Sequence, residues 1–127
     1  MTPQEGKVFM QQTKIAPLFL VYITVPDQAC ASRIAHALVH ERLAAGVNIA
    51  PLAASVYWWQ GAVHERAEYA LLAQCTQQGF EALRARVCAL HPYEVPCIVG
   101  LPLAAGHSPF WRWVEREAQP AQDGSEF

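Results

Sequence analysis

The chain has 127 residues, the size of one domain, and it is long enough to bury a core without disulfides or structural metals. Its formal net charge is −2 and its nine Lys and Arg residues are scattered, so neither nucleic acid nor an anionic membrane is an expected partner. Hydrophobic residues make up 53% of the chain and charged residues 16%. One small domain has difficulty hiding this much apolar surface, which favours oligomerisation.

The ends of the chain and its cysteines bear on location. Residues 1–16 are polar and lack the apolar stretch of a signal peptide, so they predict a flexible N-terminal arm. Residues 120–127 predict a disordered tail, which leaves 17–119 as the domain. The sequence contains no run of eighteen apolar residues, so we expect no membrane-spanning helix. The four cysteines are widely spaced, which fits reduced thiols in the cytoplasm.

The first two elements follow from apolar patterning. Leu18–Val25 is apolar at nearly every position and rich in β-branched residues, which predicts a central strand. Asp27 is a suitable cap for a helix that we expect to continue until Gly46 ends it. The apolar positions at helical spacing are Ala31, Ile34, Ala35, Leu38, Val39 and Leu43.

A long hairpin comes next. Residues 47–59 and 62–76 predict two strands joined at Gln60 and Gly61, with Pro51 as an edge irregularity or a bulge. A strand of about thirteen residues at ~3.3 Å each is roughly 43 Å long, more than the width of a domain of this size. We therefore expect the hairpin to project from the domain.

Both faces of the projecting hairpin carry aromatic rings. Val56 and Trp58 face one way, while Tyr57 and Trp59 face the other. A monomer could not bury both faces, and its strand edges would keep unpaired backbone groups. These features predict a closed, symmetric oligomer. The aromatic side chains of the hairpin then act mainly as interface anchors.

The last elements complete the fold. Thr76 is a suitable cap for a helix, and 95–101 is an apolar strand after a corner at 91–97. Ser108 followed by Pro109 predicts the start of a short terminal helix. The order βαββαβ plus a helix predicts an α+β fold, a ferredoxin-like sandwich with a long projecting hairpin and a short C-terminal helix. Both main helices then cover one face of the sheet.

The corner, His-Pro-Tyr-Glu-Val-Pro-Cys at 91–97, is the most chemically loaded segment. His91, Glu94 and Cys97 are candidate metal ligands, and a site of this softness would favour copper or zinc. The extended backbone between His91 and Cys97 keeps them apart, so a site would be completed by a neighbouring subunit or water. In the alternative interpretation, His91 closes the preceding helix and Cys97 is a buried, inert thiol.

Two further pairs have weaker claims as sites. His36 and His40 lie four residues apart on the first helix, but no third ligand is in reach, which favours a solvated face. Glu65 and Glu68 are three apart in a strand and so point to opposite faces. Either carboxylate could meet the imidazole or the phenol of the corner across a subunit boundary.

Taken in order, these segments resemble the divalent-cation tolerance protein family, CutA, over about residues 18–118. The residues that carry the resemblance are 41–49 (ERLAAGVNI), 57–61 (YWWQG), Glu65, Glu68, 91–96 (HPYEVP), Phe110 and Trp113. The resemblance implies a trimer of ferredoxin-like subunits, similar in assembly to the PII signalling proteins. It also implies a role in tolerance of copper and other divalent metals.

Three positions depart from the family pattern. Gly46 stands where a cysteine is usual, and Gln74 stands where a lysine is often found. Cys97 replaces a carboxylate, which would tilt a site toward Cu(I) or zinc.

Three functions of different classes follow from these observations. The first is a metal-binding homotrimer that responds to divalent metal ions. The second is a PII-like signalling or scaffold trimer that binds a small molecule or a protein at clefts formed by Trp59, Glu68, Tyr93 and Trp113. An enzyme is the least favoured, since the chain has no recognisable catalytic triad, phosphate loop or hydrolytic histidine motif.

Overall fold

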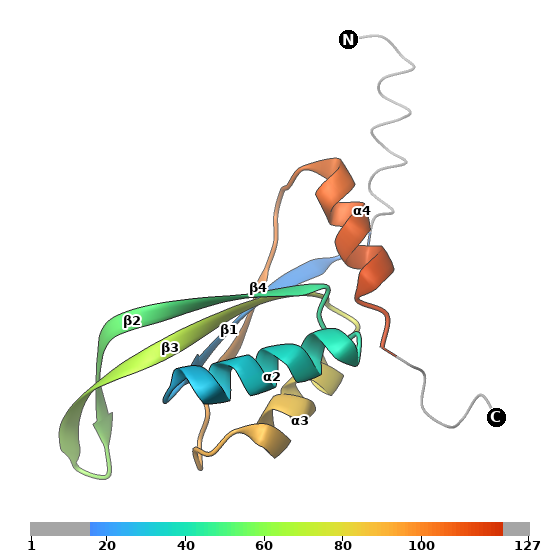
Figure 1. Cartoon of the computed structure of the whole chain (residues 1–127). Coiled ribbons are helices and arrows are strands. Elements are labelled where there is room, and N and C mark those ends of the chain that lie inside the picture. Colours follow the sequence, from blue (N-terminus) through green and yellow to red (C-terminus); the bar gives the residue numbers. More distant parts are fainter. Residues whose placement is uncertain (1–15, 121–127) are drawn as a thin grey trace, which may run out of the picture.

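The computed structural model describes residues 16–120 (Figure 1). The predicted arm, 1–16, and tail, 120–127, lie almost wholly outside these residues. The elements are β1 (Leu18–Val25), α2 (Gln28–His40), β2 (Gly46–Trp59), β3 (Ala62–Thr76), α3 (Phe80–Leu90), β4 (Ile98–Pro102) and α4 (Ser108–Glu117). None of the helices in this part of the chain combines the length and the apolar character needed to span a bilayer.

The four strands form one antiparallel sheet in the order β2-β3-β1-β4. Helices α2 and α3 lie on the same side of this sheet, and α4 lies near the start of β1, far from the hairpin tip (Figure 1). This arrangement is the predicted α+β, ferredoxin-like fold. Two split β-α-β units thereby leave the other face of the sheet without either main helix.

The helix-covered face contains the main core. Val21, Ile23 and Val25 of β1 point toward the helices and are fully buried. Ile34 and Leu38 of α2 meet them and are also fully buried. Burying each such side chain contributes about 1.5–3 kcal/mol, so this layer holds the subunit together.

The opposite face is apolar but largely open. Leu20 pairs with Leu101 and Tyr22 pairs with Val99, which places all four side chains on the face away from α2 and α3. Val99 is 46% exposed and Leu101 is 47% exposed. At the far end of the sheet, α4 closes a small second cluster, which consists of Leu18, Ala45, Val114 and Ala118 with Leu103, Trp111 and Trp113 around it.

The hairpin projects as predicted, with 14 residues in β2 and 15 in β3 (Figure 1). Gln60 and Gly61 both have positive φ, 51° and 80°, as a two-residue turn of type I′ requires. The register between β2 and β3 shifts between Leu52 and Ser55, so the expected irregularity near Pro51 is present. Because β2 is an edge strand, the proline costs the sheet little.

The prediction that the first helix continues to Gly46 was wrong. Helix α2 ends at His40, and Gly46 is the first residue of β2. Arg42 has a φ of 60°, which turns the chain out of the helix. Leu43 and Ala44 then fold back so that their amides bond the Leu38 carbonyl, and both are buried. Their burial in this turn continues the apolar pattern beyond the true end of the helix.

Two other boundaries also differ from the prediction. Thr76 ends β3, and its Oγ1 accepts a hydrogen bond from the Gly79 amide in the turn before α3, whose N-cap is Gly79. Strand β4 begins at Ile98 and not at Val95, because the corner bends through residues 93–95 before the chain becomes extended.

Candidate functional site

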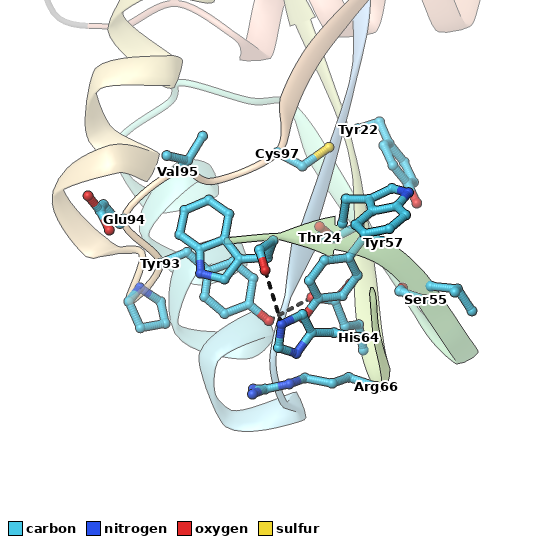
Figure 2. Close-up of a pocket in the computed structure, with 15 residues that line it drawn as sticks. Tyr22, Thr24, Ser55, Tyr57, His64, Arg66, Tyr93, Glu94, Val95 and Cys97 are labelled. Atoms are coloured by element: carbon cyan, nitrogen blue, oxygen red, sulfur yellow. Dashed lines mark hydrogen bonds between the residues drawn. The ribbon is translucent and has the colours of Figure 1, made fainter. Parts of the chain in front are cut away.

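A cavity of about 670 Å³ opens between the hairpin tip and the corner, 91–97 (Figure 2). We call it the tip cavity. Its aromatic lining consists of Tyr22, Tyr57, Trp58, Trp59 and Tyr93, and its polar lining includes Thr24, Ser55, His64, Arg66, Glu68, Glu94 and Cys97. The fold thus brings strand β1, the hairpin and the corner to one place.

The central polar contact of the cavity joins Tyr93 to Glu68. The Tyr93 hydroxyl donates to Glu68 Oε2 at 2.6 Å, and Glu68 is only 5% exposed. Burial raises the pKa of Tyr93 well above its usual value, and the hydrogen bond and charge of Glu68 raise it further. The phenol therefore stays protonated and holds the carboxylate. This contact forms within one chain, so it needs no subunit boundary.

His91 is held by the backbone on both sides of its ring. Its Nε2 lies 2.7 Å from the Thr24 carbonyl oxygen, and its Nδ1 accepts a hydrogen bond from the Tyr93 amide at 3.1 Å. These two bonds require the neutral ring with its proton on Nε2. His91 is 8% exposed and ties the corner to β1. In this arrangement neither ring nitrogen is open to a metal ion.

The other two candidate ligands of the corner point apart. Glu94 is exposed and its carboxylate points to the outside of the loop, whereas the half-buried Cys97 thiol points toward the side of Tyr22 (Figure 2). Within residues 16–120 no three His, Cys, Asp or Glu side chains come close enough to hold a metal ion. A single subunit therefore places His91, Glu94 and Cys97 on one loop without assembling them around a common point.

The predicted cleft residues are divided between two places. Trp59, Glu68 and Tyr93 line the tip cavity, but Trp113 lies on α4 at the other end of the sheet. A Cβ on Gly46 would lie 3.4 Å from Trp113 Cη2 and 2.9 Å from Gln74 Oε1. Gly46 and Gln74 are therefore neighbours, and Trp113 packs beside Gly46.

Five lining residues were not singled out from the sequence, and one of them is Ser55 on β2. Tyr22 and Thr24 alternate on β1, and His64 and Arg66 alternate on β3 in step with Glu68. The recurrence of His64, Arg66 and Glu68 at every second position of β3 is the signal that could have placed His64 and Arg66 beside Glu68. Because the sequence of β1 is apolar at nearly every position, the polar groups of Tyr22 and Thr24 did not stand out.

On the hairpin side of the cavity, the side chain of His64 contacts two residues of β2. His64 Nε2 lies 3.3 Å from the Trp59 carbonyl oxygen, and its ring stacks on Tyr57 with centroids 5.7 Å apart. The exposed guanidinium of Arg66 has no ion pair among the described residues. The cavity thus offers aromatic faces, one buried carboxylate and one available cation, a combination suited to binding.

Comparisons with known proteins show which family this chain resembles in sequence and fold. The family described as CutA1 divalent ion tolerance protein matches residues 19–117. The divalent-cation tolerance protein CutA of Thermus thermophilus is 52% identical over 95 residues, which cover 75% of this chain and 92% of that protein. A solved structure of the T. thermophilus protein superposes with a TM-score of 0.78 at 48% identity, covering 80% of this chain and 99% of that one.

A more distant structure has the same fold. The crystal structure of CutA1 from Oryza sativa has a TM-score of 0.80 at 36% identity, and the match covers 84% of this chain and 98% of that one. Sequence and structure therefore agree over nearly all of the described residues. The chain belongs to the CutA1 divalent ion tolerance protein family.

Proposed function

We propose that this chain forms a cytoplasmic homotrimer that serves in tolerance of divalent metal ions, with copper as the first candidate. The observation that carries the proposal is the open apolar face of the sheet, in a chain that belongs to a divalent ion tolerance family. The four cysteines are free thiols, which supports a reducing compartment.

The trimer is argued from two exposed surfaces. Val99 and Leu101 remain half-exposed on the sheet, and Val56 and Trp58 on the hairpin are 65% and 74% exposed. Edge strands β2 and β4 also carry backbone groups that another chain could pair. A closed ring of copies would bury both surfaces and leave no edge.

The assembly has a direct test. Light scattering at micromolar concentration should give three times the chain mass and should keep that value on dilution. A monomeric mass would contradict the proposal.

The proposed copper site lies in the tip cavity and is completed by a neighbouring subunit. Cys97, His64 and Glu68 offer sulfur, nitrogen and oxygen donors along one cavity. Such a mixture favours copper or zinc over magnesium or calcium. Cys97 carries this proposal more than His91 does, because His91 would have to give up its bond to the Thr24 carbonyl.

Copper calorimetry with thiol variants tests the metal site. Cys97→Ser should weaken copper binding at least tenfold, while Cys88→Ser, which removes an exposed thiol on α3, should leave it unchanged. Binding should also weaken as the pH falls toward 5, because imidazole and thiol ligands must lose protons. If Cys97→Ser and His91→Ala both bind copper like the unmodified chain, the corner is structural.

A second candidate is a PII-like trimer that binds a small molecule or a protein at the tip cavity. The buried Glu68 carboxylate favours it, since its partner among the described residues is a single phenol and it lines a cavity of about 670 Å³. Neither function assigns a catalytic role to the chain. EDTA separates them, because a metal-independent ligand would still bind EDTA-treated protein, and Glu68→Gln would weaken that binding.

A further inference from the structure

Helix α2 presents two imidazole rings side by side. His36 and His40 are both exposed, and their ring centroids lie 5.7 Å apart with only 20° between the ring planes. Residues four apart on a helix lie on the same face, one turn above the other. The two rings are thus held together by the helix itself.

Both rings are available for a ligand. No hydrogen bond or ion pair within residues 16–120 involves either imidazole. His91 and His64 differ, since His91 uses both ring nitrogens and His64 contacts the Trp59 carbonyl. A cation at α2 would displace no existing contact of the described residues.

The spacing is the one by which a single helix offers two histidines to zinc. Imidazole nitrogen suits copper, nickel and zinc and is a poor ligand for magnesium or calcium. In the hydrolytic version of this motif a glutamate follows the first histidine and acts as a base, but here that position is Ala37. The pair can therefore hold a metal and has no base beside it.

The local charges allow a bound cation. His40 is the last residue of α2, and the C-terminal end of a helix attracts positive charge. Glu41 follows it but is held by Arg86 at 2.9 Å, so its carboxylate is already engaged. Arg33, three residues before His36 on the same helix face, opposes a bound cation, so coordination by both imidazoles has to outweigh this repulsion. Water would complete the coordination of the metal.

We propose that His36 and His40 form a two-histidine site for a borderline divalent cation, Cu²⁺, Ni²⁺ or Zn²⁺, on the outer surface of α2. The site stands apart from the tip cavity and does not depend on the proposed function. Helix α2 covers the face of the sheet opposite the one assigned to assembly (Figure 1), and both histidines are exposed in the subunit.

Nickel calorimetry on the full chain near neutral pH tests the site, since Ni²⁺ binds imidazole without oxidising thiols. One Ni²⁺ per chain should bind at α2, and either His36→Ala or His40→Ala should weaken this binding event at least tenfold. His107→Ala removes an exposed imidazole from the loop before α4 and should change nothing. If both α2 variants bind nickel within twofold of the unmodified chain, the proposal is overturned.

The site is separated from the tip cavity by a crossed comparison. Cys97→Ser and His64→Ala should each keep nickel binding at α2, while the double variant H36A/H40A should lose it and keep its trimer mass. Nickel binding that survives in H36A/H40A and disappears in His64→Ala would place the metal in the cavity and overturn the α2 site. Failure of the cavity proposal would instead appear as unchanged copper binding when Cys97→Ser is added to H36A/H40A, in which α2 no longer contributes.

Discussion

The two faces of the sheet are built from the same strands but are completed differently. On the helix side, Val21 and Ile23 of β1 are fully buried by the chain's own helices. On the other side, Val99 and Leu101 of β4 are as apolar but remain nearly half-exposed. Hydrophobic sequence therefore does not by itself indicate a core. The topology decides which apolar face the subunit closes and which face needs a partner.

The largest effect is expected on the helix-covered face. Ile34→Ala removes a fully buried side chain of α2 and should lower the free energy of unfolding by about 2–5 kcal/mol. Urea unfolding measures this, with Val39→Ala, on the exposed side of the same helix, as the control. A loss below 1 kcal/mol would mean that the helix layer contributes less than its burial indicates.

The hairpin tip should matter for assembly more than for the subunit. Trp59→Ala should destabilise the trimer by about 2–4 kcal/mol if the ring anchors an interface. Light scattering on dilution and the thermal midpoint report the effect, and Val39→Ala again serves as a control for an exposed apolar residue. An unchanged mass and midpoint would place Trp59 in solvent.

Two adjacent residues of β4 sharpen the contrast between the faces. A Cβ on Gly100 would lie 2.8 Å from Phe19 Cδ2 and 3.0 Å from Phe80 Cε1, so Gly100→Ala should cost the fold about 1–3 kcal/mol through overpacking. Its neighbour Leu101 points to the open face. Leu101→Ala should instead promote dissociation of the trimer. If Gly100→Ala and Leu101→Ala affected assembly equally, the two faces of the sheet would not have the different roles proposed for them.

The smallest expected effect concerns Tyr93. Tyr93→Phe leaves Glu68 without its donor and should cost about 1–2 kcal/mol at neutral pH. Because folding raises the pKa of Tyr93, the stability from its neutral phenol is fully present below about pH 10, the value in unfolded chains, and is lost as the pH rises through the folded pKa.

The alkaline range provides the readout for this residue. Urea unfolding between about pH 9 and 11 should show a decline in the unmodified chain that is smaller in Tyr93→Phe. Tyr57→Phe, which removes another hydroxyl of the cavity lining, is the matched control. Identical pH profiles for the unmodified chain and Tyr93→Phe would show that the phenol does not couple ionisation to folding.

Strong local patterns predicted the fold well. Leu18–Val25 and Ala62–Thr76 are strands with the predicted bounds, because β-branched runs and turn residues mark both ends. The end of α2 was missed because Leu43 continues its apolar spacing although it belongs to a turn. Residue spacing alone does not report the left-handed φ of Arg42 that ends the helix.

The sequence predicted several residues of the site but not the contacts between them. Glu68 and Tyr93 were both named as candidates, yet their hydrogen bond depends on how the corner lies against β3, which no local pattern encodes. Trp113 was grouped with Trp59 although the fold separates them. Whether they meet across subunits is a property of the assembly, so the trimer and its metal remain predictions.

The register shift in the hairpin has a consequence for how the chain tolerates changes in length. Ala53 and Ala54 are exposed and lie where β2 has one residue more than β3, while pairing is regular on either side. Deleting one of these alanines would leave every other strand pair in place and straighten the ribbon, whereas a deletion from 55–59 would turn the aromatic rings to the opposite face. An insertion or deletion in this short segment would therefore change the direction of the hairpin tip while the strand pairs on either side stay the same.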